Sequence, residues 1–301
     1  MAPDIAFLHD RAVTYGRSEQ LSPLVRRVVA RNPSPFTYTG TGTYIVGHGE
    51  VAVIDPGPAL PDHLAALKAA LTGERVSHIL VTHTHSDHSP AAGPLKQASG
   101  APTYGFGPHG SGRPDQDVRV EEDGDRAFRP DHRLRDGAVI RGSGWSLEVL
   151  HTPGHTSNHL CYALIEEGTL FSGDHVMGWS TSVISPPDGD MQAYMRSLKR
   201  LMTREDALYR PAHGPPIPEP RRHVAALIAH RQRREQEIAA ALQAGLTAIP
   251  QMVERIYAEV PRHLHPAAAR TVLAHLIHMV ETRRALCDGP PGAFSRYAPP
   301  A

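Results

Sequence analysis

The stretch V-T-H-T-H-S-D-H-S-P, from Val81 to Pro90, packs three histidines and an aspartate into six residues directly after an apolar run that predicts a β-strand. Histidine nitrogen and carboxylate oxygen are ligands that Zn²⁺ favours in proteins. Where a chain leaves a strand, residues i and i+2 point the same way, so His83 and His85 can share one metal ion. Asp87 and His88 lie one turn further on and can face a second ion.

One histidine cluster rarely fills a coordination shell, so further ligands are expected elsewhere in the chain. Candidates stand where other expected strands end, in the motifs H-T-P-G-H (151–155), S-G-D-H (172–175) and P-A-H-G (211–214). Loops that leave the strands of a layered α/β protein can meet at one edge of the sheets. The sequence therefore predicts a metal site that is assembled from several loops.

The segments around these motifs alternate between expected strands and expected helices. Two β-rich runs within residues 36–55 flank G-H-G-E and predict a hairpin. Apolar residues recur at helical spacing within 60–71, and a short helix is expected near 91–98. Further strands are expected near 137–151, 159–165, 168–172 and 207–210, with a helix around 191–202. This mixture predicts a layered α/β protein, interrupted by an aperiodic insertion loop at 105–135.

A proline-rich stretch at 215–220 marks a change in the composition of the chain. Beyond it, apolar stripes near 249–257 and 273–280 predict helices. We therefore expect a catalytic α/β domain over residues 1–215 and a helical C-terminal domain, with a proline-rich tail, over residues 216–301. The C-terminal part has 11 arginines and no lysine against seven acidic residues, a balance of +4. Because the whole chain is neutral, the first 215 residues carry −4.

The bulk composition is typical of a globular protein inside the cell. Hydrophobic residues make up 40% and charged residues 21%, and a net charge of zero gives no general attraction to nucleic acid or anionic membrane. The chain lacks the roughly 20-residue apolar run that spans a bilayer, and its first residues lack the features of a signal peptide. Two cysteines cannot make a disulfide framework. A cytoplasmic location without a membrane partner is therefore expected.

The order of four motifs resembles the metallo-β-lactamase superfamily: H-x-H-x-D-H at 83–88, T-P-G-H at 152–155, S-G-D at 172–174 and A-H-G at 212–214. The resemblance covers about residues 28–215 and implies an αββα sandwich with a dinuclear metal site at one edge. It implies the ligands of the two ions, which are His83, His85 and His155 for one, Asp87, His88 and His213 for the other, and Asp174 as the bridge.

Further residues have expected roles around this site. Asp55, at the end of V-A-V-I-D-P-G, matches the first motif of the family. In that family the residue usually positions the metal ligands without binding the metal itself. His159 completes a pattern that resembles H-T-x-x-H of hydroxyacylglutathione hydrolases, so it either faces the substrate or only begins a strand. Trp179 follows the bridging aspartate by five residues and either walls the substrate pocket or packs within the fold. His151 and His175 are expected to support or pack.

The implied ligands suit two Zn²⁺ ions best, although Fe or Mn also fits them. Two such ions, about 3.5–4 Å apart, hold a bridging hydroxide that attacks an electrophilic carbon or phosphorus. Asp87 would orient this hydroxide as well as bind metal. We therefore expect a metal-dependent hydrolase. A non-catalytic nucleic-acid-binding protein of this fold would have lost ligands, and a redox di-iron enzyme normally carries a flavin domain, so both are less favoured.

One branch of the superfamily is more similar than the others. The segments 32–37, 40–44 and 173–181 resemble the β-lactamase-like protein 2 family, which has a C-terminal winged-helix-like domain, although Gly42 stands where that family has asparagine. Animal members cut single-stranded RNA, and fungal relatives act as thioesterases on acyl carrier protein. The bridging aspartate argues against a true β-lactamase. The negative balance of residues 1–215 favours an acyl ester or thioester, with single-stranded RNA as the alternative and a homodimer compatible with both.

Overall fold

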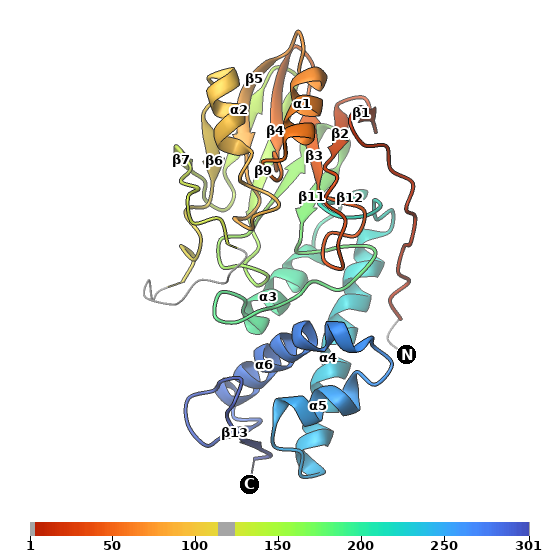
Figure 1. The fold of residues 1–301 in the computed structure, drawn as a ribbon, viewed down its shortest axis with the longest axis vertical. Helices are drawn as coiled ribbons and strands as arrows, with labels where there is room; N and C mark the ends of the chain where they lie inside the picture. The colour runs from red at the N-terminus through yellow and green to blue at the C-terminus, as the bar shows by residue number, and fades with distance from the viewer. Residues whose placement is uncertain (1–3, 114–123, 301) are drawn as a thin grey trace.

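The computed structural model describes residues 4–113 and 124–300. A sandwich of two β-sheets forms the upper part of Figure 1, and helices gather in a second part below it. Both ends of the described chain lie beside the helical part. No helix within the described residues is long and apolar enough to cross a membrane. Part of the expected insertion loop, residues 114–123, lies outside the described residues.

The first sheet contains seven described strands, which lie side by side in their sequence order. They are β1 (Ser18–Gln20), β2 (Val25–Val29), β3 (Gly42–Val46), β4 (Glu50–Ile54), β5 (Arg75–Leu80), β6 (Thr103–Gly105) and β7 (His132–Arg133). The pairs from β1 to β4 are antiparallel, and those from β4 to β7 are parallel. The expected hairpin is confirmed, because β3 and β4 pair across the turn between them.

The expectation of a structureless loop over 105–135 is wrong at its C-terminal end. There β7 extends the first sheet by pairing His132 with Tyr104. Phe128 is buried in the core between the sheet and its helices. A strand of two residues has no readable periodicity, so its pairing depends on neighbours that only the folded chain supplies.

The second sheet contains five described strands in the order β12-β11-β10-β9-β8. They are β8 (Val139–Gly142), β9 (Trp145–His151), β10 (Leu160–Leu164), β11 (Thr169–Gly173) and β12 (Leu208–Pro211). The pair β11–β12 is parallel, and the other pairs are antiparallel. All five fall at the segments where the sequence predicted strands.

Apolar side chains alternate between the two faces of each sheet and so build separate core layers. Tyr44 and Val46 pack between the sheets, whereas Ile45 packs on the opposite face beneath two helices. These helices are α1 (Pro61–Ala70) and α2 (Ala92–Ser99), and they cover the outer face of the first sheet (Figure 1). The helix α3 (Met191–Leu201) covers the outer face of the second sheet. The αββα sandwich that the sequence predicted is therefore confirmed.

The C-terminal part is helical and has its own core. It contains the helices α4 (Pro220–Gln243), α5 (Ile249–Ile256) and α6 (His265–Glu281) and the 3₁₀ turn η2 (Arg262–Leu264). The short strands β13 (Leu286–Cys287) and β14 (Tyr297–Ala298) pair with each other after these helices. Another 3₁₀ turn, η1 (Ile165–Glu167), lies in the sandwich. Val224 and Leu227, near the start of α4, pack against the second sheet, whereas Ile238 and Leu242 pack in the helical core. Because α4 contributes to both cores, a division at residue 215 stays a prediction.

Candidate metal centre

Four loops bring the predicted ligands together at one edge of the sandwich. Each loop follows the C-terminal end of a strand: β5 precedes His83, His85, Asp87 and His88, while β9, β11 and β12 precede His155, Asp174 and His213, respectively. Within the described residues, these side chains form three overlapping groups of three, and the ligand atoms of each group lie within 4.8 Å of one another. The motifs that are separated in sequence by up to 130 residues therefore meet in one place, as the sequence predicted.

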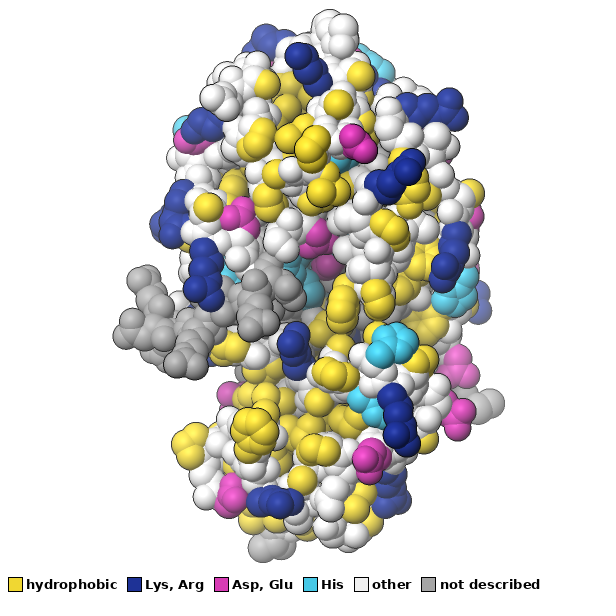
Figure 2. Space-filling view, viewed as in Figure 1, with side chains coloured by type: hydrophobic (Ala, Val, Ile, Leu, Met, Phe, Trp, Pro, Cys, Tyr) yellow, Lys and Arg dark blue, Asp and Glu magenta, His cyan; other side chains and the backbone are white. Residues whose placement is uncertain are grey.

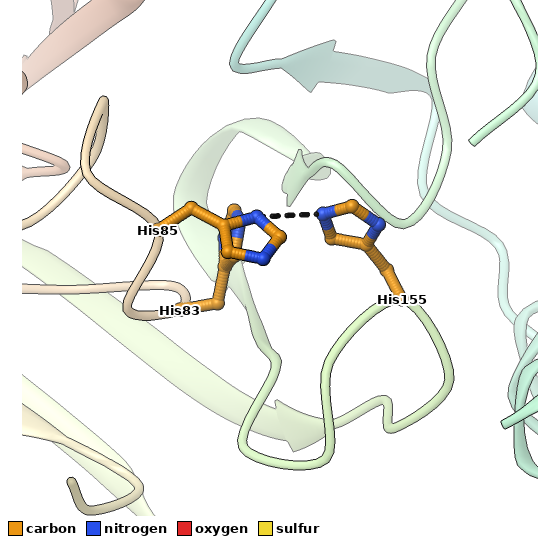
Figure 3. Close-up of side chains that lie close together, drawn as sticks. All are labelled: His83, His85 and His155. Carbon is orange, nitrogen blue, oxygen red and sulfur yellow. Dashed lines mark hydrogen bonds between the residues drawn. The ribbon is translucent and has the colours of Figure 1, made fainter. Parts of the chain in front are cut away.

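The first group is made only of histidines. His83 Nε2 lies 3.0 Å from His85 Nδ1, and His155 Nε2 lies 3.1 Å from the same atom. Figure 3 shows the three rings facing one another across the gap between two loops. Ligands of a tetrahedral zinc ion, at about 2.0–2.1 Å from the metal, lie about 3.3 Å apart. The first group therefore has nearly the spacing that one such ion requires.

The second group combines a carboxylate with two histidines. Asp87 Oδ2 lies 3.1 Å from His213 Nε2 and 3.3 Å from His88 Nε2. Thr41 holds the carboxylate from the side, because its hydroxyl donates a hydrogen bond of 3.3 Å to Asp87 Oδ2. A bridge between Thr41 and His213 joins the loop before β3 to the loop after β12. The second group therefore depends on contacts between the two sheets.

The carboxylate of Asp174 lies between the two groups. Its Oδ1 is 3.2 Å from His213 Nε2 and 3.6 Å from His88 Nε2, and its Oδ2 is 3.8 Å from His155 Nε2. Asp174 Oδ1 and His88 Nε2 are buried polar atoms that have no hydrogen-bond partner among the described residues. Buried polar atoms without a partner are rare in proteins. Their convergence with the other ligand atoms fits a pair of metal ions bridged by Asp174.

Asp55 lies directly behind the second group and is buried. Its Oδ1 accepts a hydrogen bond of 2.7 Å from the Thr82 backbone N–H, and its Oδ2 accepts one of 2.7 Å from the Thr82 hydroxyl. His88 donates Nδ1–H to Asp55 Oδ2 at 3.0 Å, which leaves Nε2 directed at the site. The backbone of Asp55 has a φ of +49°, a strained conformation for a residue with a side chain. The fold thus maintains strain to keep this carboxylate behind His88.

Two further predicted ligands, His155 and His213, are oriented by backbone carbonyl groups. His155 donates Nδ1–H to the carbonyl oxygen of Val183 at 2.6 Å. His213 Nδ1 lies 3.3 Å from the carbonyl oxygen of Gly40. In each case the bond at Nδ1 selects the tautomer in which Nε2 can bind a metal.

Burial and charge shift the pKa values of the clustered groups in opposite directions. Burial lowers the pKa of His83 well below its usual range, and the neighbouring histidines add to this effect. Burial also acts to lower the pKa of His213, but the carboxylates of Asp174 and Asp87 outweigh it and raise the pKa to about 10. Burial acts to raise the pKa of both carboxylates, and the adjacent histidines instead hold them well below normal. Because metal binding requires a free nitrogen lone pair, binding at His213 must release a proton.

The site reaches the surface beside Asp87, whose side chain is 23% exposed. Figure 2 shows acidic and histidine side chains near the middle of the visible face, above the helical part. Trp179 is half-buried and stacks on Tyr38 with ring centroids 4.8 Å apart. A Cβ atom on Gly214 would lie 2.7 Å from Trp179 Cδ1, so the indole lies against the loop that carries His213. The structure therefore brings Trp179 close to the site.

The structure does not expose His159 to the surface. The ring is completely buried, and its Nε2 accepts a hydrogen bond of 3.2 Å from the backbone N–H of Asp174. Its Nδ1 pairs with the Thr152 hydroxyl at 2.9 Å. His159 therefore supports the backbone of Asp174 from within the fold instead of facing a substrate. The sequence pattern located the residue correctly near the site but could not indicate the direction of its side chain.

The remaining histidines of the same loops pack within the protein. His175 is buried beside the Tyr194 ring, with centroids 4.7 Å apart, and burial lowers its pKa to about 3. His151 stacks on Phe106 with centroids 4.2 Å apart. Both therefore occupy packing positions, as the sequence predicted.

His63 is a supporting residue whose importance the sequence did not indicate. It lies on α1, and its ring is buried. Its Nε2 lies 3.0 Å from both the Thr43 hydroxyl and the Pro56 carbonyl oxygen, behind the turn that carries Asp55. A Cβ atom on Gly57 would lie 2.8 Å from that nitrogen. The D-P-G turn was the available signal, because it marks a place where another group can approach the backbone closely.

Known sequences are similar to this chain over most of its length. Residues 38–213 match the Metallo-beta-lactamase superfamily, and residues 248–289 match the Beta-lactamase associated winged helix domain. A Beta-lactamase-like protein 2 homolog of Drosophila melanogaster is 34% identical over 276 residues, which cover 85% of this chain and 88% of that protein. An atrochrysone carboxyl ACP thioesterase of Paecilomyces divaricatus is 34% identical over 247 residues, which cover 79% of this chain and 70% of that protein.

Solved structures match the fold over nearly the whole chain. A metallo-beta-lactamase family protein from Thermus thermophilus has a TM-score of 0.75 at 24% identity, covering 93% of this chain and all of that one. A Beta-lactamase domain protein from Burkholderia ambifaria has a TM-score of 0.77 at 21% identity, covering 98% of this chain and 97% of that one. The chain belongs to the metallo-β-lactamase superfamily, carries a C-terminal winged-helix domain, and is a hydrolase with a candidate metal site.

Proposed function

We propose that the chain hydrolyses an acyl ester or thioester at a dinuclear zinc site. The observation that carries this proposal is the position of the Asp174 carboxylate, whose two oxygens face different groups of ligands. In the proposed site, His83, His85 and His155 would hold one ion and Asp87, His88 and His213 the other, and Asp174 would serve both. The donor set of histidine nitrogen and carboxylate oxygen suits Zn²⁺, and Fe or Mn also fits it.

Two divalent metal ions supply activation of water and polarisation of a carbonyl oxygen when they are bound. The protein contributes orientation. Asp87 is partly exposed, and its carboxylate is fixed by Thr41, so it can accept a hydrogen bond from the attacking water and aim it at the substrate. Asp55 keeps the Nε2 atom of His88 in place from behind. Trp179 forms a wall beside the loop of His213 and offers an apolar surface to an acyl group.

Two observations favour an acyl substrate. The residues before 216, which include all the proposed ligands, carry a balance of −4, which does not favour binding of a polyphosphate chain. In addition, the similar protein of Paecilomyces divaricatus is named an ACP thioesterase. Cleavage of a thioester would release a carboxylate and a free thiol, which a thiol reagent can measure continuously.

The test is a panel of acyl thioesters and esters of increasing chain length, assayed with zinc-loaded protein and with Asp87→Asn prepared identically. We expect hydrolysis that requires metal and falls by about 10²–10⁴-fold in the variant, because the positioned carboxylate is lost while the size of the side chain is kept. Full metal occupancy without hydrolysis of any member of the panel would reject the acyl proposal.

Endoribonuclease activity on single-stranded RNA is the second candidate, and a groove in the helical part favours it. The groove lies between α3, α4 and α6 and has a volume of about 800 Å³. Lys199, Arg283 and Arg284 line it, together with one acidic residue, Glu235, which pairs with Arg284. Cations of this kind contact nucleic-acid phosphates, and such contacts supply much of the affinity for RNA.

End-labelled single-stranded RNA distinguishes the two candidates. Metal-dependent cutting that disappears in Asp87→Asn and weakens in an Arg283→Gln, Arg284→Gln double variant would favour the nuclease. If RNA remains intact and thioesters are hydrolysed, the acyl proposal holds. The cytoplasmic location and a homodimer stay predictions, which fractionation of cells and light scattering would test.

A further inference from the structure

Arg231 is a buried cation in the middle of α4, and its surroundings are unusual. The residue is only 2% exposed, yet it forms no ion pair with any described carboxylate, and its Nε has no hydrogen-bond partner among the described residues. The guanidinium lies over the Tyr194 ring, 5.3 Å from its centroid. A buried charge without a counter-charge is unfavourable for stability. Another role must therefore account for its position.

Among the described residues, the hydrogen bond that the Arg231 side chain makes leads toward the candidate metal centre. Its Nη2 donates a short hydrogen bond to the carbonyl oxygen of Ser182, which lies in the loop after β11. The Ser182 hydroxyl in turn contacts the carbonyl oxygens of Asp174, at 2.5 Å, and His175, at 2.9 Å. Ser182 is itself buried. Ser182 thus connects the guanidinium of Arg231 to the backbone of Asp174, the proposed bridging ligand.

The residue after Ser182 supports a second proposed ligand. Val183 accepts the Nδ1–H hydrogen bond of His155 at 2.6 Å. The dipeptide 182–183 therefore contacts the backbone of one ligand and the ring of another. Tyr194, beneath the guanidinium, also donates its hydroxyl to the carbonyl oxygen of His175, at 3.1 Å. Displacement of this dipeptide would move Asp174 and His155 together.

We propose that Arg231 is a positioning residue through which the helical part holds the metal-binding loop in its ligand-bearing conformation. Its helix is firmly anchored, since Val224 and Leu227 of α4 pack against the second sheet. The planar guanidinium stacks on Tyr194 and directs its N–H groups at a fixed angle, which a lysine ammonium cannot reproduce. The helical part thereby becomes a structural component of the metal centre. This inference rests on the dinuclear site proposed above.

The test compares metal affinity, by competition with a chromophoric chelator, among the full-length wild type, Arg231→Met and Arg231→Lys. Methionine keeps much of the length without the charge or the donors. We expect Arg231→Met to bind zinc about 10–100-fold more weakly, as found when partners of metal ligands are removed, and Arg231→Lys to recover only part of the loss. The visible spectrum of the cobalt-substituted protein should also change, because it reports ligand geometry directly.

Arg233→Met is the matched control, because Arg233 lies on the same helix, is partly exposed and pairs with Asp4 at the surface. It should bind zinc like the wild type. Urea unfolding of the metal-free proteins separates a general loss of stability from a local effect. If Arg231→Met does not fold, Arg231→Lys carries the test. Ser182→Ala then tests the next contact, since it removes the hydroxyl that bonds the carbonyl oxygens of Asp174 and His175 but keeps the carbonyl oxygen that accepts from Arg231.

The outcomes separate this inference from the proposed function. A folded Arg231→Met protein with wild-type zinc affinity and an unchanged cobalt spectrum would overturn the positioning role, even if the wild type is an active dinuclear hydrolase. A wild type that binds no metal would instead overturn the proposed site itself, and the role of Arg231 with it. Weaker zinc binding in Arg231→Met, with Arg233→Met unaffected, supports the inference.

Discussion

Buried histidines occur in both parts of the molecule, but their surroundings differ. At the edge of the sandwich, His88 and His213 lie 3.6 and 3.2 Å from the same carboxylate oxygen of Asp174. In the helical part, His275 is completely buried, its Nδ1 is 3.6 Å from Glu235, and neither ring nitrogen has a hydrogen-bond partner among the described residues. All the groups of described residues that could hold a metal ion lie in the sandwich. Convergence with carboxylates, rather than burial of histidine, therefore distinguishes the candidate metal centre.

The pKa values of these histidines follow the same division. Beside the carboxylates, the pKa of His88 is raised well above normal although burial opposes it. Burial lowers the pKa of His275 well below normal, and the nearby Arg231 adds to the effect. A histidine next to carboxylates is ready to exchange its proton for a metal ion, whereas one among arginines stays neutral. Substitutions in the two parts should therefore have different consequences.

The largest effect is expected for Asp174→Asn at the sandwich edge. The variant keeps the shape of the side chain but loses the charge that faces both ligand groups. Removal of a residue that hydrogen-bonds a metal ligand lowers metal affinity or activity by about 10–100-fold. Asp174 is itself a proposed ligand, so we expect its substitution to lower activity by more than about 100-fold. Metal analysis by mass spectrometry should find fewer than two ions per chain. Two tightly bound ions and normal turnover would contradict the bridging assignment.

A smaller effect is expected for Asp55→Asn, which acts behind His88. The amide can still accept from Thr82, but it replaces one acceptor oxygen with a donor and so opposes the Nδ1–H of His88. We expect metal affinity and turnover to fall by about 10–100-fold, with the free energy of unfolding of the metal-free protein changed much less. Calorimetric titration with zinc measures the affinity. An unchanged affinity would contradict the role of the Asp55 carboxylate behind His88.

In the helical part, His275→Leu should leave the metal content unchanged and alter the pH dependence of stability. Because the pKa of His275 is lowered in the folded state, the unfolded chain binds a proton first as the pH falls below about 6.5. The contribution of His275 to the free energy of unfolding is therefore fully present above that pH and is lost as the pH falls toward the lowered pKa of the folded state. Urea unfolding should show that the free energy of unfolding falls by about 1–2 kcal/mol more in the wild type than in the variant when the pH is lowered from 7 to 5. Equal losses would contradict the assignment of a neutral buried histidine.

The smallest effect concerns the two cysteines, one in each part. Cys161 is completely buried in the second sheet, and burial raises the pKa of its thiol to about 12. Cys287 is half-exposed in the helical part. A thiol reagent at pH 8 should therefore label one cysteine rapidly in the native protein and both in urea, because the thiolate is the reactive form. Peptide mapping should identify the rapid site as Cys287.

The convergence of the candidate ligands could be predicted from the sequence, because their donor chemistry is local. His83, His85, Asp87 and His88 stand together in one motif, and strand-ending motifs identify the partners at His155 and elsewhere. The supporting residues were less predictable. Nothing in the helical sequence around Arg231 distinguishes it from the neighbouring Arg233 and Arg234, which are less buried, and His63 has no motif of its own. Their roles depend on contacts with residues distant in the sequence.

The edges of the fold were also less predictable than its centre. Strands such as β3 and β10 are entirely buried apolar runs, so their sequence defines them. The strand β7 has two exposed residues and exists only because β6 offers it a pairing partner. Likewise, α4 reads from sequence as part of a separate helical domain, yet its first half packs on the second sheet. Short or bridging elements are decided by their neighbours rather than by their own composition.

The class of fold and the candidate ligands could be predicted from the sequence, because periodicity, donor chemistry and the motifs that carry the family resemblance are properties of short segments. The tertiary structure decided which ligand atoms meet, which way His159 points, and how the helical part reaches the metal centre through Arg231 and Ser182. Those outcomes depend on the direction of side chains and on hydrogen bonds between loops brought together by sheet packing. Neither is encoded in the spacing of residues along the chain, because packing fixes both only once the two sheets and α4 have come together.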